Sequence, residues 1–220
     1  TSLNPLQRIG DHFYETIRTH EPGVSKVEAR ERAGEMFDHL GIQRERLMDY
    51  PHQLSGGMRQ RVMIGLALIL NSDLVLADEP TTSLDVIVEA QILDLLKDLK
   101  AAYHMTLVLI SHNLGIVAEL ADRLAVMYAG KLVEVAPALD LFDKPYHPYT
   151  QGLLASVPNI RLEDEELRTM PGAPPDLIHP PEGCRFHPRC AHAMERCGYE
   201  EPLYREVTGE RWTACWLYEK

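Results

Sequence analysis

The sequence is poor in basic residues, has no long apolar run, and contains no cysteine before residue 184. Its 220 residues include 22 Lys and Arg against 33 Asp and Glu, which gives a net charge of −11. So acidic a chain repels phosphates, which argues against non-specific binding to nucleic acid or anionic lipid. The longest strongly apolar stretch, 62–70, has nine residues, whereas a membrane-spanning helix needs about 20. The sequence therefore predicts no transmembrane segment.

The first residues also lack two features. The chain begins with Thr-Ser-Leu-Asn-Pro, without an initiator Met and without a basic segment followed by an apolar one. We therefore expect this chain to be part of a longer protein whose front has been removed. Apolar residues make up 45% and charged residues 25% of it, which is the composition of a folded globular protein.

Helical spacing of apolar residues dominates the first 53 positions. The residues that recur at this spacing are Val27, Ala33, Met36, Phe37 and Leu40. From residue 54 to about 135, helices and strands are expected to alternate: a helix ending near Leu70, a strand over 74–77, a helix over 86–103, a strand over 106–110, a helix over 114–121, and a hairpin of 124–128 with 132–135. In the helix over 86–103 the inward residues are expected to be Ile87, Ile92, Leu95, Leu96 and Leu99.

The two strands over 74–77 and 106–110 are continuously apolar, which indicates a buried parallel sheet covered by helices on both faces. In such folds ligands bind beyond the carboxyl ends of the strands. After residue 136 the composition changes, since 137–181 holds nine prolines. We expect short helices over 137–157, an extended linker over 158–181 and a small cysteine-bearing module over 182–220.

A glycine-containing string, Leu-Ser-Gly-Gly-Met-Arg-Gln-Arg, starts at Leu54. Gly56 and Gly57 let the backbone approach an anion without interference from a Cβ atom. Free N–H groups and the dipole of a helix start favour phosphate, and Ser55 adds a hydroxyl donor. The alternative is an ordinary helix N-cap with a glycine-rich entry.

Acidic residues follow the first strand, and a histidine follows the second. Asp78 and Glu79 come directly after the run Leu-Val-Leu-Ala, and Asp78 is a candidate ligand of Mg²⁺ through water. Glu79 would orient or deprotonate an attacking water, and His112 would donate a hydrogen bond to a phosphate or to that water. The alternatives are that the acidic pair caps the next helix and that His112 is a packed or surface residue.

The order and spacing of these strings resemble the ATP-binding cassette (ABC) ATPases. The string from Leu54, the string Leu-Val-Leu-Ala-Asp-Glu-Pro-Thr-Thr-Ser-Leu-Asp and the string Ile-Ser-His-Asn-Leu-Gly carry this resemblance. It implies that 54–58 is the signature motif and 83–85 the D-loop. It also implies that Asp78 is the Walker B aspartate, Glu79 the catalytic glutamate and His112 the switch histidine.

In that family two subunits enclose two ATP molecules head to tail. The resemblance therefore implies that Ser55, Gly56 and Gly57 bind the partner subunit's ATP, with Asp85 of the D-loop among the nucleotide-binding residues. It implies an α/β fold: part of a P-loop NTPase (RecA-like) parallel sheet with a helical subdomain and a C-terminal extension. The expected domains are 1–53 (part of the helical subdomain), 54–136 (the C-terminal part of the ATPase core) and 137–220 (the extension).

One motif of the family is missing from these 220 residues. The string Gly-x-x-x-x-Gly-Lys-[Ser/Thr], which would enclose the phosphates of ATP, does not occur. We therefore expect this piece alone to hydrolyse ATP poorly or not at all.

The residues after 146 narrow the resemblance to the ATPases of dipeptide and oligopeptide importers. The strings that carry it are His-Pro-Tyr-Thr-Gln-Gly-Leu-Leu, Pro-Gly-Ala-Pro-Pro-Asp-Leu and Gly-Cys-Arg-Phe-His-Pro-Arg-Cys, together with Thr-Ser-Leu-Asn-Pro at the start. Cys184, Cys190, Cys197 and Cys215 lie close enough in sequence to form one four-thiolate site, whose softness suits zinc or iron–sulfur. The resemblance implies a [4Fe–4S] cluster; the alternatives are Zn²⁺ and unliganded thiols or disulfides.

The resemblance implies an ATPase subunit that drives peptide uptake with ATP and Mg²⁺ at the cytoplasmic face of a cell membrane. The implied partners are a second, different ATPase subunit, two transmembrane permease subunits and an extracytoplasmic peptide-binding protein, with no nucleic acid. Nickel or another small solute is an alternative cargo. Two other hypotheses are a soluble cassette ATPase that acts on nucleic acid or ribosomes, and a non-enzymatic metal-binding or regulatory fragment.

Overall fold

A computed structural model describes residues 3–82, 84–156 and 170–219. The chain divides into two units, Thr1–Ile116 and Val117–Lys220. The three domains expected from the sequence, with limits at 53 and 136, stay a prediction.

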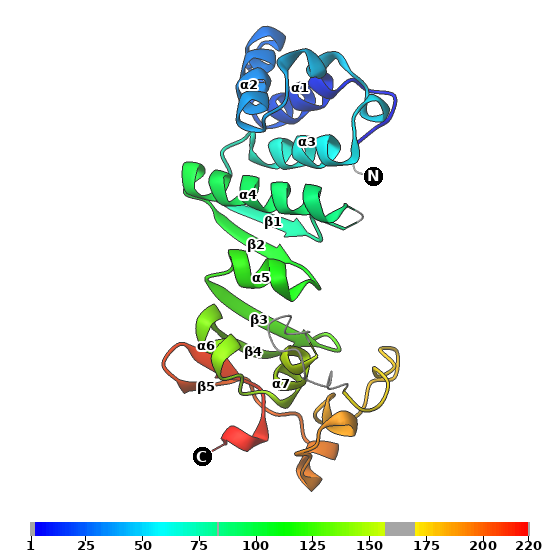
Figure 1. Cartoon of the computed structure of the whole chain (residues 1–220), viewed down its shortest axis with the longest axis vertical. Coiled ribbons are helices and arrows are strands. Elements are labelled where there is room, and N and C mark those ends of the chain that lie inside the picture. The colour runs from blue at the N-terminus through cyan, green and yellow to red at the C-terminus, as the bar shows by residue number, and fades with distance from the viewer. Residues whose placement is uncertain (1–2, 83, 157–169, 220) are drawn as a thin grey trace. The chain divides into compact units, whose positions relative to one another are not determined.

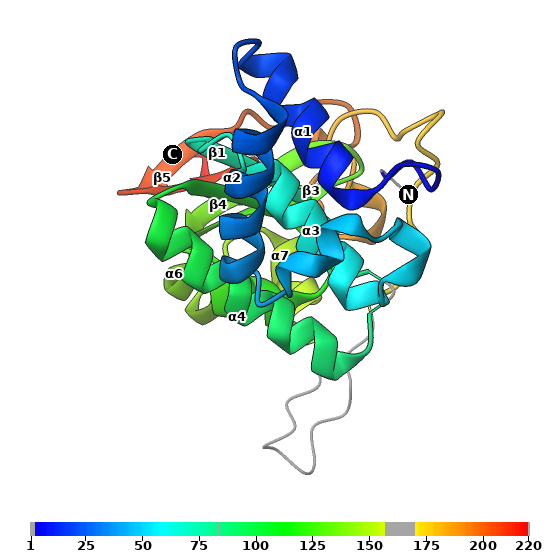
Figure 2. The same cartoon turned by 90° about the horizontal axis from the view of Figure 1, so that it is seen from above.

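The first unit begins with a cluster of helices, as the sequence predicts. Its elements are α1 (Ile9–His20), α2 (Lys26–His39) and two 3-10 turns (Arg44–Met48 and Pro51–Gln53). Phe13 and Phe37 pack edge to face, with ring centroids 5.7 Å apart, and join α1 to α2. Figure 2 shows these two helices in blue. Val27 is 81% exposed, because it lies six residues before Ala33, about 120° around the helix from it.

The next two helices of this unit, α3 (Gly56–Leu68) and α4 (Val86–Tyr103), lie against each other (Figure 1). The apolar side of α4 contributes Ile92, Leu96 and Leu99 to the core. The prediction that Ile87 points inward is wrong, since it is 72% exposed. It lies five residues before Ile92, which turns it about 140° away on the helix.

The sheet of the first unit consists of β1 (Leu74–Asp78) and β2 (Thr106–Ile110). The two strands are parallel, as predicted, with Leu74 opposite Thr106 and Asp78 opposite Ile110. The prediction that they are buried on both faces is wrong. Val75 belongs to the core that includes α4, but the side chains that alternate with it are exposed: Leu74, Leu76, Val108 and Ile110. In the described residues, therefore, only one face of this sheet is covered.

The second unit contains an antiparallel sheet with the strand order β3-β4-β6-β5. Its strands are β3 (Arg123–Tyr128), β4 (Lys131–Pro137), β5 (Arg205–Thr208) and β6 (Arg211–Thr213). The helix expected over 114–121 is α5 (Leu114–Leu120), which spans the limit between the units. The predicted hairpin is present, and its turn residues Ala129 and Gly130 both have positive φ, 48° and 77°. This is the backbone that a two-residue hairpin turn requires.

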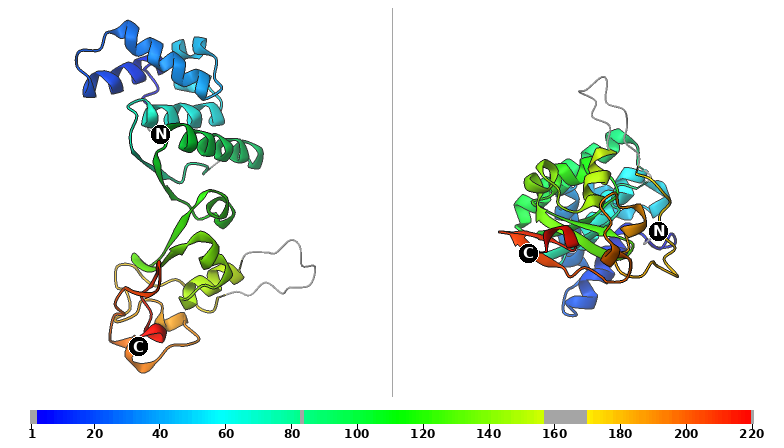
Figure 3. Two further views of the ribbon diagram at one scale, coloured as in Figure 1. Left: turned by 90° about the vertical axis from the view of Figure 1, so that its left-hand side faces the viewer. Right: turned by 90° about the horizontal axis from the view of Figure 1, so that it is seen from below.

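The expected short helices after residue 136 are α6 (Ala138–Asp143) and α7 (Pro148–Ala155). Figure 3 (left) shows both, in light green, beside the hairpin. Residues 157–169 of the expected linker lie outside the described residues. The cysteine-bearing segment forms 3-10 turns at His187–Arg189, Glu195–Gly198 and Trp216–Tyr218, and its strands β5 and β6 extend the sheet begun by β3 and β4. It therefore shares a sheet with the hairpin.

Two buried polar side chains connect β4 to the start of α7. The Glu134 carboxylate is only 1% exposed and accepts hydrogen bonds from the N–H groups of Tyr146 (2.7 Å) and His147 (2.9 Å). Nδ1 of His147 accepts from the N–H of Tyr149 at 3.0 Å and caps α7. Both side chains satisfy backbone groups that would otherwise be buried without partners.

The buried His147 is expected to make the free energy of unfolding depend on pH. Burial lowers the pKa of His147 from 6.5 to about 4. Between these two pH values, His147 is therefore protonated in the unfolded chain but neutral in the folded chain. Stability should therefore fall as the pH drops from 6.5 to 4, by about 3 kcal/mol from this residue. His147→Asn keeps a capping acceptor and does not titrate. Urea unfolding at pH 7 and pH 4.5 should show a smaller loss for His147→Asn than for the wild type, and equal losses would contradict the assignment.

Candidate functional site

Glu79 and His112 meet at the carboxyl ends of the two parallel strands. Glu79 directly follows β1, and its N–H donates to the carbonyl of Ile110, the last residue of β2, at 2.9 Å. His112 follows β2 two residues later. Its N–H donates to Oε1 of Glu79 at 3.1 Å, and its Nδ1 lies 2.8 Å from both carboxylate oxygens. The sequence prediction that the histidine lies beside the acidic pair is thus met by the geometry.

Hydrogen bonds lower the pKa of Glu79 below its usual range. The main cause is the bond with the His112 side chain, followed by the bond with the Thr82 hydroxyl. Because the carboxylate is ionised near neutral pH, Nδ1 of His112 must carry the proton of the shared hydrogen bond. The His112 side chain is 79% exposed, so the ring remains accessible to a ligand while it contacts Glu79.

Thr82 is a member of this site that the sequence did not indicate. Its hydroxyl donates to Oε2 of Glu79 at 2.8 Å, and its N–H donates to the Glu79 carbonyl at 3.2 Å. Residues 79–82 therefore form a turn that brings Thr82 back to the carboxylate. The spacing of three residues after Glu79, with Pro80 between them, is a signal of such a turn.

Asp78 is the last residue of β1 and is exposed. A carboxylate at an exposed strand end suits Mg²⁺, which keeps much of its hydration shell and binds through one or two oxygens. The donor type and accessibility of Asp78 thus fit the predicted magnesium ligand.

Ser55 stands at the start of α3, with the two glycines immediately after it. Its Oγ accepts a hydrogen bond from the N–H of Met58 at 3.2 Å, so Ser55 caps α3. Ser55 and Gly56 are exposed and Gly57 is half-buried. The helix start is therefore accessible, and the hydroxyl proton of Ser55 is not used by the cap.

Gly57 has a packing role that the sequence did not show. A Cβ atom on Gly57 would lie 2.6 Å from Cγ1 of Val88, whereas one on Gly56 would lie 3.8 Å from Leu84. The first distance is shorter than real Cβ contacts and the second is ordinary. Glycine at position 57 thus permits the close approach of α3 to α4.

The remaining predicted nucleotide-binding residue, Asp85, caps α4. Its Oδ1 accepts from the N–H of Val88 at 2.9 Å. Of the expected D-loop 83–85, Ser83 lies outside the described residues. Leu84 lies near Gly56, so the D-loop and the start of α3 are neighbours within the first unit.

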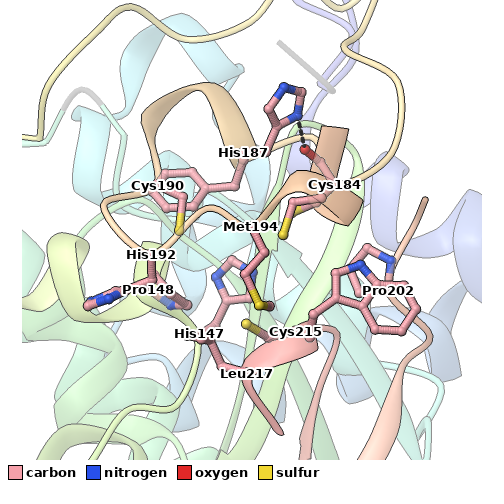
Figure 4. A pocket seen from close by; sticks show the side chains of 13 residues that line it. His147, Pro148, Cys184, His187, Cys190, His192, Met194, Pro202, Cys215 and Leu217 are labelled. Carbon is pink, nitrogen blue, oxygen red and sulfur yellow. Dashed lines mark hydrogen bonds between the residues drawn. The ribbon is translucent and has the colours of Figure 1, made fainter. Parts of the chain in front are cut away.

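The four cysteines line one small pocket in the second unit. Cys184, Cys190, Cys197 and Cys215 surround a cavity of about 20 Å³ together with His147, Met194 and Trp216. Such a volume is close to that of a single water molecule. All four cysteines are free thiols. Figure 4 shows the Met194 side chain among the sulfurs of Cys184, Cys190 and Cys215.

The predicted metal centre finds no support in this pocket. Within residues 3–82, 84–156 and 170–219, no three His, Cys, Asp or Glu side chains are arranged so that they could hold a metal ion. Burial raises the pKa values of Cys184 and Cys190, and that of Cys215 to about 11. The [4Fe–4S] cluster and the alternative Zn²⁺ are therefore without support in the described residues.

Comparison with known proteins shows the family of this chain. Residues 2–82 match the family described as "ABC transporter", and residues 133–197 match "Oligopeptide/dipeptide transporter, C-terminal region". A dipeptide transport ATP-binding protein DppD from Caldanaerobacter subterraneus subsp. tengcongensis is 44% identical over 220 residues, covering 100% of this chain and 68% of that protein. The chain belongs to the ABC transporter ATPases, in the oligopeptide and dipeptide importer group.

Further relatives of this ABC ATPase chain carry similar names. The oligopeptide transport ATP-binding protein AppD of Bacillus subtilis is 48% identical and covers 100% of this chain and 67% of that protein. The oligopeptide transport ATP-binding protein OppD of Escherichia coli is 47% identical, and the match covers 98% of this chain and 64% of that protein. The chain thus spans about two thirds of the length of these relatives.

A solved structure confirms the α/β cassette fold. The dimeric structure of MJ0796, titled a bacterial ABC transporter cassette, has a TM-score of 0.54 and 29% sequence identity, and the match covers 62% of this chain and 59% of that one. A post-hydrolysis state of the same cassette bound to ADP and Pi matches equally well. In the described residues of this ABC ATPase chain, no helix is long and apolar enough to cross a membrane.

Proposed function

We propose that this chain is part of the ATP-hydrolysing subunit of an importer that takes up dipeptides or oligopeptides. The observation that carries the proposal is the contact between Glu79 and His112 at the carboxyl ends of β1 and β2. The family membership supports ATP with Mg²⁺ as the nucleotide. The printed names of the relatives, dipeptide and oligopeptide transport ATP-binding proteins, support the cargo.

Each candidate site residue would have a separate role in ATP hydrolysis. Bound Mg²⁺ would neutralise phosphate charge, and Asp78 would hold it through water. Glu79 would accept the proton of the attacking water, and His112 would donate a hydrogen bond to the terminal phosphate. Ser55 and the N–H groups that follow it would face the ATP held by a partner subunit, because an exposed helix start favours an anion.

The proposed assembly has two ATPase subunits, two transmembrane permeases and an extracytoplasmic peptide-binding protein. The dimeric form of the solved cassette supports the pairing of ATPase subunits, and we propose a second, different subunit as the partner. The subunit would be peripheral, at the cytoplasmic face of the membrane. Nickel as cargo is less favoured, because the relatives named above are all transport proteins for dipeptides or oligopeptides.

Paired serine variants test this proposal in the protein that carries this chain, assembled with its permeases. Ser25 and Ser55 cap α2 and α3 in the same way, each accepting an N–H at 3.2 Å. Alanine at either position should cost about 1 kcal/mol of stability. Only Ser55→Ala is expected to reduce Mg²⁺-dependent ATP hydrolysis and uptake of a labelled dipeptide. Equal activity of the two variants, or uptake of Ni²⁺ in place of the peptide, would contradict the proposal.

A further inference from the structure

The Glu79 carboxylate is held from two sides by different parts of the chain. His112, 33 residues further along, contacts both oxygens from the end of β2. Thr82, from the turn directly after β1, donates its hydroxyl hydrogen to Oε2 at 2.8 Å. The two contacts differ in origin, because His112 reaches Glu79 from the end of the neighbouring strand, whereas Thr82 reaches it from the turn that begins at Glu79 itself.

The backbone at Glu79 adds a reason for such an anchor. Glu79 has a φ of 47°, a left-handed conformation that is unfavourable for a residue with a Cβ atom. The conformation persists only when surrounding contacts compensate for it. The hydrogen bond of the Glu79 N–H to the Ile110 carbonyl and the bond of the Thr82 N–H to the Glu79 carbonyl fix this backbone. They do not fix the carboxylate itself, whose Oε1 accepts the His112 N–H at 3.1 Å and whose Oε2 depends on side-chain partners.

The Thr82 hydroxyl is not needed to cap the helix that follows. Asp85 caps α4 with its own carboxylate, and the Thr82 hydroxyl contacts a side chain instead of a free backbone group. Its contact therefore serves Glu79 and not the start of α4.

We propose that Thr82 is a positioning residue for Glu79: its hydroxyl fixes Oε2, so that the carboxylate keeps its orientation toward the attacking water when His112 engages the terminal phosphate. This inference rests on the proposed function, because it assigns a role within ATP hydrolysis. It adds to that function a residue that acts through Glu79 without contacting the nucleotide.

Thr82→Val and Thr82→Ser test this inference in the assembled transporter. Valine keeps the size and the β-branch but removes the donor, whereas serine keeps the hydroxyl. We expect kcat for ATP hydrolysis to fall about tenfold or more in Thr82→Val, since a hydrogen bond to a charged group is worth at least about that factor. The KM for ATP should not change, and Thr82→Ser should recover most of the activity. Thr106→Val, an exposed threonine at the far end of β2, is the matched control and should behave as the wild type.

A double variant separates positioning from a general structural effect. In the Glu79→Gln background, Thr82→Val should cause no further loss, because a residue that acts through Glu79 has nothing left to position. Wild-type kcat in Thr82→Val, an equal loss in Thr82→Ser, or a further loss in the double variant would overturn the inference. Failure of the proposed function looks different, because the wild-type protein itself would then show no hydrolysis that depends on Glu79.

Discussion

Replacing Glu79 with glutamine is expected to reduce the rate of ATP hydrolysis by about 100-fold or more, the scale of a lost general base. Glutamine is nearly isosteric, and its amide oxygen still accepts the hydrogen bonds that His112 gives to Oε1. The amide cannot take a proton from water, so the chemical step should fail while ATP still binds. Single-turnover hydrolysis and equilibrium binding of ATP, measured on the assembled transporter, separate these two steps.

Glu45→Gln provides the control for the loss of one negative charge. Glu45 is exposed in the 3-10 turn Arg44–Met48, away from the ends of the parallel strands, and its variant should hydrolyse ATP at the wild-type rate. Hydrolysis by Glu79→Gln within a few-fold of the wild type would refute the role assigned to Glu79. A loss of ATP binding in that variant would instead indicate a structural role.

Gly57→Ala is expected to destabilise the first unit by about 1–3 kcal/mol, the usual cost of overpacking. The added methyl group would lie 2.6 Å from Cγ1 of Val88, and a valine has no flexible end that can move aside. The matched control is Gly56→Ala, whose methyl group would meet Leu84 at an ordinary 3.8 Å. Urea unfolding should show a lower midpoint for Gly57→Ala and no comparable drop for Gly56→Ala.

The double variant Gly57→Ala with Val88→Ala separates packing from nucleotide binding. Removing the Val88 methyl groups opens the space that the methyl group added at position 57 requires, so the double variant should be more stable than Gly57→Ala alone. If ATP hydrolysis stays low while stability returns, the glycine is also needed for close approach to the nucleotide. A Gly57→Ala chain as stable as the wild type would show that the contact between α3 and α4 tolerates a methyl group.

Three candidate site residues could be predicted because each lies close to the end of a short apolar run that the sequence shows directly. Asp78, Glu79 and His112 each follow a short apolar run closely, and parallel strands place such positions at one edge of a sheet. Thr82 escaped prediction because its role depends on a turn with a left-handed Glu79. Pro80 signals a turn, but no residue type marks a left-handed backbone at position 79 when glycine is absent there.

Burial was harder to predict than the elements themselves. The runs that form β1 and β2 are apolar throughout, and such a run does not reveal whether one or both faces are covered. Leu76 and Val108 are therefore exposed where burial was expected. The cysteine spacing likewise predicts proximity, which the pocket shows, but not the orientation of the sulfurs or their ionisation.

The pairing of β6 with β4 has a consequence for biosynthesis. Val135 on β4 lies opposite Trp212 on β6, so the hairpin leaves the ribosome well before the strand that completes its sheet. During that interval the backbone groups of β4 have no partner on this side and can pair with a neighbouring nascent chain. Completion of this sheet during translation thus requires β6, and a premature stop before Arg211 would yield an association-prone product.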